Sequence, residues 1–188
     1  MKADDQLTSS IKTEMTVMVA DVTSNQARLY CGEKSYPCVV GRGGVTSDKI
    51  EGDHKTPLGR FALRTVYYRP DRILDLKKLS LPTFPLRPEW GWCDDPDDPL
   101  YNQRIARPYD GHHEVMWRDD HLYDLVVVLS YNEPPSTPGK GSAIFLHVAP
   151  NDFSGTEGCI ALSLSDLREV LVNCNADAWL TVRVVDDA

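Results

Sequence analysis

The sequence predicts a mainly β fold, a sandwich or barrel, with one helix. Short apolar and β-branched runs bounded by turn-forming residues recur along the chain, whereas only one stretch has leucines and valines at helical spacing. No internal repeat or low-complexity segment is present. The 188 residues, 41% of them apolar, suffice for one domain with one core. We expect a mobile tail over residues 1–14 and a single domain over 15–188.

The first part of that domain is expected to form an antiparallel meander. "MTVMVAD" (15–21) and "ARLYCG" (27–32) flank a polar turn, "YPCVVG" (36–41) follows "GEKS", and "FALRTVYY" (61–68) follows a long loop punctuated by glycine and proline. Alternating β-branched and aromatic residues favour strands, and the segments between them are rich in turn formers.

Residues 69–121 interrupt this pattern and are rich in proline, aspartate and tryptophan. Their centre, "LPTFPLRPEWGWCDDPDDPLYN", has too many prolines for a helix or a central strand. We interpret the segment as a long ordered insertion, which Trp90, Trp92, Tyr101 and Trp117 hold against the main body. Insertions of this length in compact domains are usually binding loops or lids.

The remaining elements follow the insertion. "LYDLVVVLSY" (122–131) and "SAIFLHV" (142–148) are apolar enough for two buried central strands. "SLSDLREVLVNC" (163–174) has helical spacing, and Ser163 with Asp166 is typical of a capped helix start. "AWLTVRVV" (178–185) predicts a last strand.

Charge excludes some functions. A net charge of −8 disfavours nucleic acids and anionic membranes as partners, because both bind basic surfaces. No apolar run approaches the roughly 20 residues that span a bilayer, and the start "MKADDQLTSSIKTEM" is too polar for a signal peptide. We therefore expect no membrane span, and this chain shows no export signal.

Five cysteines follow no CxxC pattern, so a zinc ribbon or a thioredoxin-like motif is absent. Cys31 and Cys38 can face one another across a hairpin, which leaves a disulfide there open. The aspartates near residue 95 are broken up by prolines and lack the alternating spacing of a calcium loop. We expect no metal.

"LHVAPNDFSGTEGCIAL" (146–162) raises the central question of whether Cys159 is a buried small residue or a nucleophile. A cysteine attacks as thiolate, which a neighbouring histidine stabilises. If 142–148 and 159–164 are adjacent strands, the side chains of His147 and Cys159 can meet. Gly158 allows close backbone approach, and the N–H groups of Gly158 and Cys159 can then face an oxyanion. On this segment alone both interpretations stay open.

A second segment favours catalysis. "KTPLGRF" (55–61) resembles the T-P-x-G-x-F motif of the L,D-transpeptidase (YkuD-type) catalytic domain, and "H…TEGCIAL" resembles its His…Ser-His-Gly-Cys signature. The two motifs occur in the order of that family, and the resemblance covers most of residues 15–186. It implies the family's mixed β-sandwich or barrel-like fold, with Cys159 as nucleophile and His147 as base.

The resemblance also implies a reaction. Such enzymes attack a peptidoglycan tetrapeptide stem at its third residue, a diamino acid, and expel the terminal D-Ala. The thioester then passes to an amine of another stem or to water. No cofactor is implied, carbapenem-type inhibitors are possible ligands, and the implied location is the periplasm or cell envelope.

The sequence departs from the family pattern around Cys159. The family's second histidine is replaced by Glu157, the arginine two residues after the cysteine by Ala161, and a glycine after the first histidine by Val148. A carboxylate at residue 157 can accept a hydrogen bond, orient a loop, or raise the pKa of the thiol. These departures, together with the insertion, resemble a proteobacterial branch, some members of which join stems through the first residue. The bond that forms, through the first or the third residue, stays open.

Residues expected to bind the substrate surround this pair. Residues 41–72 carry more Lys and Arg than Asp and Glu, and Arg42 and Lys55 are our preferred anion-binding residues. Thr56 and Glu157 are also expected at the substrate, and Trp92 can stack on a sugar or close a cleft. His54 is expected to be exposed and inert.

Two other functions remain as alternatives. One is an L,D-carboxypeptidase or amidase, in which water replaces the acceptor amine. The other is a non-catalytic module that binds the cell wall through the aromatic insertion.

Overall fold

The structure of the chain, a computed structural model, describes residues 13–185. Most of the expected tail therefore lies outside the described residues. At its inner end the tail prediction is wrong, because Glu14 already begins a strand and lies opposite Trp179.

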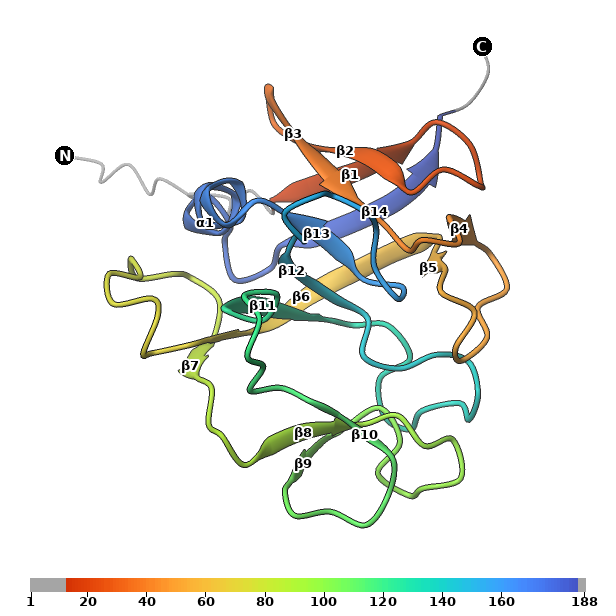
Figure 1. The fold of residues 1–188 in the computed structure, drawn as a ribbon. Helices are drawn as coiled ribbons and strands as arrows, with labels where there is room; N and C mark the ends of the chain where they lie inside the picture. Colours follow the sequence, from red (N-terminus) through yellow and green to blue (C-terminus); the bar gives the residue numbers. More distant parts are fainter. Residues whose placement is uncertain (1–12, 186–188) are drawn as a thin grey trace, which may run out of the picture.

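One nine-stranded sheet dominates the described residues (Figure 1). Its members are β1 (Glu14–Val19), β2 (Gln26–Cys31), β3 (Lys34–Val39), β6 (Gly59–Tyr68), β7 (Thr83–Pro85), β11 (Leu125–Leu129), β12 (Phe145–Val148), β13 (Ile160–Leu162) and β14 (Trp179–Val184). Their order is β11-β12-β13-β3-β2-β1-β14-β6-β7, and β11 also pairs with β6. This last pairing closes the sheet into a barrel, which confirms the predicted mainly β class.

The predicted meander is right for three strands and wrong for the fourth. β1, β2 and β3 are sequential and antiparallel, but β3 next pairs with β13, whereas β6 lies between β14 and β11. β1 and β14 are parallel, as are β12 and β13. Such long-range parallel pairs follow from burial of the inward-facing residues around the whole barrel, which a local pattern of alternation does not specify.

The predicted helix is present as α1 (Leu164–Val172). Ser163 caps it by accepting a hydrogen bond from the Asp166 N–H, as expected. Leu167, Val170 and Leu171 bury one face of the helix in the barrel core. No helix in residues 13–185 has the length and apolarity needed to cross a bilayer.

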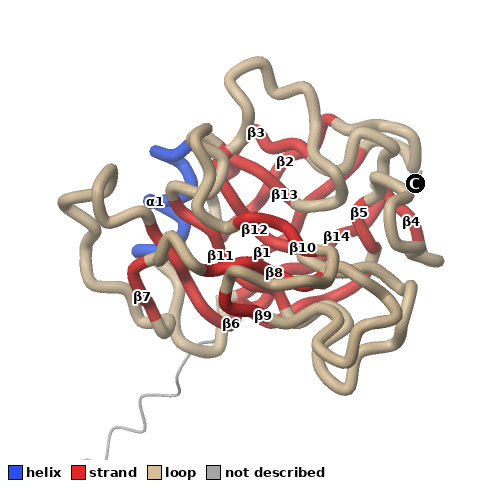
Figure 2. The backbone as a smooth tube through the Cα atoms, turned by 60° about the horizontal axis from the view of Figure 1, so that its bottom comes forward, coloured by secondary structure: helices blue, strands red, loops and turns tan. Residues whose placement is uncertain are grey.

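The insertion contains more regular structure than its prolines suggested. β8 (Trp90–Cys93), β9 (Arg104–Ala106) and β10 (His113–Val115) form a separate sheet in the order β10-β8-β9. In Figure 2 this sheet lies across β11 and β12. The expected aromatic anchoring is confirmed: the Trp92 ring meets Phe145 of β12 edge-on, with 5.0 Å between centroids.

The loop that precedes β6 also contains two short strands, β4 (Val45–Thr46) and β5 (Thr56–Pro57). Cys31 and Cys38 do not pair. In the β2–β3 hairpin Cys31 lies opposite Lys34 and Cys38 opposite Ala27, so this register separates the two thiols, and all five cysteines are free.

Candidate active site

Cys159 lies immediately before β13, on the outer face of the barrel. Its Sγ accepts a hydrogen bond from the Phe145 N–H at 3.3 Å and donates one to the Ala143 carbonyl oxygen at 3.1 Å. Both partners belong to β12 or to the residues that lead into it. The thiol is therefore fixed against the neighbouring strand and keeps its proton on a backbone acceptor.

His147 lies on the same outer face of the next strand. In the parallel pairing of β12 with β13 it is opposite Ala161, two residues beyond Cys159. The Cα atoms of His147 and Cys159 are therefore offset by two residues along the strand and by one inter-strand spacing, a separation of roughly 8 Å. At this separation the two side chains approach one another diagonally. The prediction that residues 142–148 and 159–164 are adjacent is confirmed.

The tautomer of His147 follows from its contacts. Nδ1 lies 2.8 Å from the Val148 carbonyl oxygen, which can only accept, so Nδ1 carries the proton. Nε2 is then the nitrogen that can take up another proton. The imidazole is 4% exposed, and Tyr123 packs edge-on against it at 5.3 Å between centroids.

Burial keeps the resting pair neutral. It lowers the pKa of His147 to about 4. Burial, with a smaller contribution from the negative charge of Glu114, raises the pKa of the Cys159 thiol to about 12. Because neither group ionises at neutral pH, a thiolate and an imidazolium form only when a substrate stabilises them.

The "KTPLGRF" segment holds the loop that carries Cys159. Thr56 is fully buried, and its Oγ1 accepts a hydrogen bond from the Gly41 N–H and donates to the Gly158 carbonyl oxygen, both at 2.8 Å. Gly158 has φ +138°, and a Cβ there would lie 3.0 Å from the Lys55 carbonyl oxygen. Two loops about a hundred residues apart are thus packed backbone to backbone, which requires glycine.

One of the two predicted oxyanion donors is already engaged. The Gly158 N–H donates to Thr156 Oγ1 at 3.1 Å, and that hydroxyl in turn donates to the Cys159 carbonyl oxygen at 2.7 Å. This leaves the Cys159 N–H as the remaining candidate of the predicted pair.

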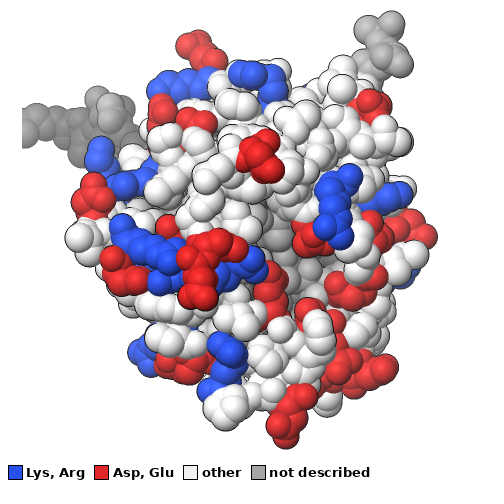
Figure 3. Space-filling view, viewed as in Figure 1, with Lys and Arg blue, Asp and Glu red and all other residues white. Residues whose placement is uncertain are grey.

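A cavity of about 580 Å³ opens in front of the thiol and the imidazole. Among its lining residues are four acidic ones and one arginine: Glu51, Asp94, Glu114, Glu157 and Arg118. Acidic side chains also gather over the insertion, at the lower right of Figure 3. A substrate group that enters the cavity therefore meets a mainly negative wall.

The predicted anion-binding pair does not line this cavity. Arg42 Nη1 forms an ion pair with Glu157 at 2.6 Å. His54 is half-buried, lines the cavity and also pairs with Glu157, so it is not the exposed, inert side chain that was expected. Lys55 contributes its backbone to the packing against Gly158 and is not among the lining residues. The excess positive charge of this segment is neutralised by neighbouring carboxylates, and the sequence does not reveal this pairing.

Two other predicted substrate contacts are also internal. Thr56 is buried and acts on the loop, as described above. Trp92 is 8% exposed, and its Nε1–H donates to Asn102 Oδ1 at 2.9 Å. It lies beneath a neighbouring hollow and not in the cavity of Cys159. Of the five predicted contacts, only Glu157 reaches that cavity.

Among the cavity residues that the sequence analysis missed, three lie close to one another and carry charged or hydroxyl groups. Glu114 of β10 and Arg118 come from the insertion, and Tyr123 precedes β11. The charge that raises the pKa of the thiol is that of Glu114, a role we had considered for Glu157. The one signal for Glu114 is a carboxylate directly before the apolar residues "VMW" (115–117), which short-range patterns do not connect to Cys159.

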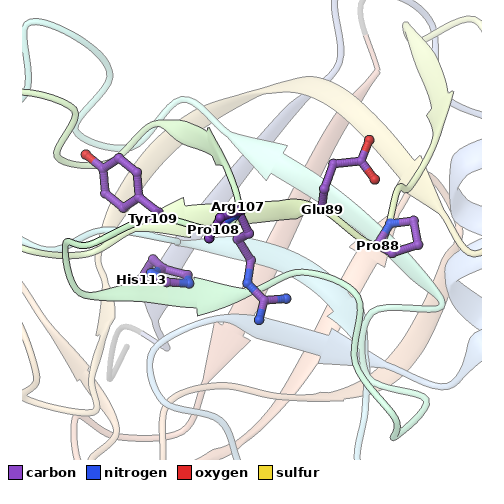
Figure 4. Close-up of a pocket in the computed structure, with 6 residues that line it drawn as sticks. All are labelled: Pro88, Glu89, Arg107, Pro108, Tyr109 and His113. Carbon is purple, nitrogen blue, oxygen red and sulfur yellow. The ribbon is translucent and has the colours of Figure 1, made fainter.

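A second hollow, of about 520 Å³, lies on the insertion itself. Figure 4 shows the side chains of Glu89 and Arg107 extending away from one another there, so they do not converge on one ligand group. Neither Cys159 nor His147 lines it. Residues 13–185 contain no cluster of three or more His, Cys, Asp or Glu that could hold a metal ion.

The comparison with family models identifies one family. The family model described as the L,D-transpeptidase catalytic domain (YkuD) matches residues 15–184. None of the curated proteins compared with the chain matches it.

Solved structures similar to the chain include the helical cell shape determining protein Pgp2 from Campylobacter jejuni, at 18% identity and a TM-score of 0.46, covering 94% of this chain and 50% of that one. Another is L,D-transpeptidase 1 from Mycobacterium tuberculosis, at 12% identity and a TM-score of 0.39, with 92% and 62% covered. A third is an L,D-transpeptidase from Mycobacterium smegmatis, at 14% identity and a TM-score of 0.40, with 91% and 59% covered. The chain thus spans 50 to 62% of the length of these proteins.

Proposed function

The chain belongs to the L,D-transpeptidase catalytic-domain (YkuD) family, and from this premise we propose that it is a cysteine acyltransferase that acts on peptidoglycan stem peptides. The observation that carries the proposal is the placement of Cys159 and His147 on adjacent parallel strands, on one face, in one cavity. A substrate of this kind would place the protein in the periplasm or cell envelope.

The first step is attack by Cys159 on a stem carbonyl. His147 Nε2 takes the thiol proton as the C–S bond forms, and its Nδ1–H remains bonded to Val148, which orients the ring. The Cys159 N–H immediately precedes β13 and would lie beside the carbonyl that the thiol attacks, so it is our candidate donor to the oxyanion. The protonated imidazole then gives its proton to the leaving amine, and a thioester remains.

The second step releases the thioester. An amine of a second stem yields a cross-link, through the first or the third residue of the stem, whereas water yields a trimmed stem. The insertion forms one wall of the cavity and so limits which acceptor reaches the thioester.

Purified tetrapeptide-stem muropeptides test this function. Wild type should yield cross-linked dimers, trimmed stems or both, with a thioester adduct visible by intact mass, and Cys159→Ala should yield neither product nor adduct. Cys31→Ala is the matched control, because this thiol lies on β2, away from the cavity, and its loss should change nothing. Identical products from wild type and Cys159→Ala would rule out this nucleophile, and the ratio of dimer to trimmed stem separates the transferase from the hydrolase.

One observation favours the non-catalytic alternative, namely a thiol whose pKa is raised to about 12 by burial. A thiol-reactive probe at neutral pH and a carbapenem distinguish the two. Acylation of Cys159 by the carbapenem supports catalysis, whereas no modification of Cys159 by either reagent supports a binding module.

A further inference from the structure

Glu114 reaches the active-site cavity from the insertion. In the β8–β10 pairing it lies opposite Trp92, so both side chains are on the same face of that sheet. Trp92 packs against Phe145 on the outer face of the barrel. Glu114 therefore faces the strands that carry Cys159 and His147, and it lines the cavity with them.

The carboxylate of Glu114 is held by one of its oxygens. Tyr123 Oη donates to Oε1 at 2.6 Å, and Arg118 Nη1 lies 3.6 Å from the same atom. Arg118 itself is held by Asp120, with Nη2 and Oδ2 2.6 Å apart. Within residues 13–185 no hydrogen bond reaches Oε2, and the side chain is 27% exposed. One oxygen thus fixes the group and the other is available to a ligand.

We propose that Glu114 binds the ammonium group of the acceptor and takes its proton, so that the amine can attack the thioester on Cys159. The inference rests on the proposed acyltransferase function and assigns the acceptor half of the reaction to the insertion.

The step balances as follows. The carboxylate removes one proton from the ammonium and becomes a carboxylic acid. The neutral amine attacks the thioester carbonyl, a C–N bond forms and the C–S bond breaks. The second nitrogen proton passes through His147 to the departing sulfur, which returns as a thiol. The carboxylic acid then loses its proton to solvent.

His147 is less suited to the first proton transfer. Burial lowers the pKa of His147 to about 4, whereas burial raises the pKa of Glu114 above its ordinary value, so the carboxylate is the stronger base of the two. The charged and titratable groups near Glu114 include an arginine, two aspartates, a tyrosine and the catalytic pair: Arg118, Asp94, Asp120, Tyr123, Cys159 and His147.

The test begins with a thioester preformed from a tetrapeptide stem. A second stem is added, and the rates of cross-link formation and of hydrolysis are measured separately. In Glu114→Gln the cross-linking rate at neutral pH should fall by about 100-fold or more, while hydrolysis changes by less than about threefold. Because only amine that is already neutral can then react, raising the pH toward the amine pKa of about 10 should restore cross-linking. Alkylation of the free thiol should become faster, because a negative charge has been removed.

Two further variants complete the design. Glu89→Gln removes a carboxylate from the outer hollow of Figure 4 and should leave both rates unchanged. Tyr123→Phe keeps the carboxylate but removes its hydrogen bond, so cross-linking should fall by about 10-fold, and this variant carries the test if Glu114→Gln does not fold.

Each outcome supports or overturns the proposed role of Glu114. Cross-linking by Glu114→Gln at the wild-type rate, or an equal fall of cross-linking and hydrolysis, overturns the role of Glu114 and leaves the nucleophile untouched. A wild-type thioester that only water releases also overturns it. If wild type forms no thioester at all, the proposed function fails, and the inference fails with it.

Discussion

The two halves of the cavity are built in different ways. In the barrel half, Cys159 and His147 line the cavity and are fixed by strand pairing and by hydrogen bonds to backbone groups, and the buried Thr56 ties the loop that carries Cys159 through the Gly158 carbonyl oxygen. The insertion half has a three-stranded sheet of its own, but side chains hold that sheet against the barrel, among them those of the Tyr123–Glu114 and Trp92–Asn102 hydrogen bonds. The barrel half therefore follows from the strand order, whereas the insertion half depends on individual side chains. The first positions the thiol and, in our proposal, the second selects what reacts with it.

Asn102 joins the two halves and gives the largest expected effect on stability. Its Oδ1 accepts from Trp92 Nε1 at 2.9 Å and from the Ala143 N–H at 3.0 Å, and its Nδ2 donates to the carbonyl oxygens of Tyr131 and Asn132. Asn102→Ala leaves these buried groups without partners and should lower the free energy of unfolding by about 3 to 4 kcal/mol.

The same variant tests the connection to the thiol. Ala143 also accepts the Cys159 S–H hydrogen bond, so its displacement should slow thioester formation as well. Urea unfolding and intact-mass kinetics measure the two effects. Loss of stability with an unchanged rate of thioester formation would show that the halves are independent.

His147 should make stability depend on pH. Its pKa is about 4 in the folded chain and about 6.5 when unfolded, so the unfolded state binds more protons between these values. The stabilisation is complete above pH 6.5 and lost as the pH falls toward 4, a change of about 3 kcal/mol. His147→Gln should reduce the slope of unfolding free energy against pH in this window. Equal slopes in the two proteins would contradict the burial argument.

The sequence predicted the barrel half better than the insertion half for a physical reason. The strands around His147 and Cys159 are buried on both faces, and such strands are continuous apolar runs that can be recognised locally. The pairing of β12 with β13 could therefore be anticipated from the sequence, whereas the strands that neighbour β6 could not. The resemblance supplied the roles of Cys159 and His147.

The missing contacts join residues that the sequence pattern does not connect. Glu114 approaches Cys159 only because a three-stranded sheet folds across the barrel, and Arg42 is withdrawn from the cavity by Glu157. Charge in a loop predicts a basic patch only if its partners are known. Side-chain pairing of this kind is determined by tertiary structure and leaves no periodic pattern in the sequence.

Thr56 is the counterpart of Asn102 within the barrel half. Thr56→Val keeps the shape but leaves the Gly41 N–H and the Gly158 carbonyl oxygen unpaired, which should cost about 2 kcal/mol of unfolding free energy. The loop that carries Cys159 loses its tie to residue 41, so thioester formation should slow by about 10-fold. Thr46→Val, on the partly exposed strand β4, is the control. A stable variant with a wild-type rate would mean that the motif threonine does not position the loop.

Glu157 gives the smallest expected effect, although it stands where the family resemblance places a histidine. Its side chain is 66% exposed, and its carboxylate is paired with Arg42 and His54 at the rim of the cavity. Exposed ion pairs contribute about 0 to 1 kcal/mol, so Glu157→Gln should change the unfolding free energy by less than about 1 kcal/mol. Because the charge that raises the pKa of the thiol is that of Glu114, alkylation of Cys159 should also change by less than about threefold. Glu114→Gln is the matched comparison under the same alkylating conditions. If Glu157→Gln accelerates alkylation more than Glu114→Gln does, the charge that raises the pKa of the thiol is that of Glu157, in the barrel half, and not that of Glu114, in the insertion half.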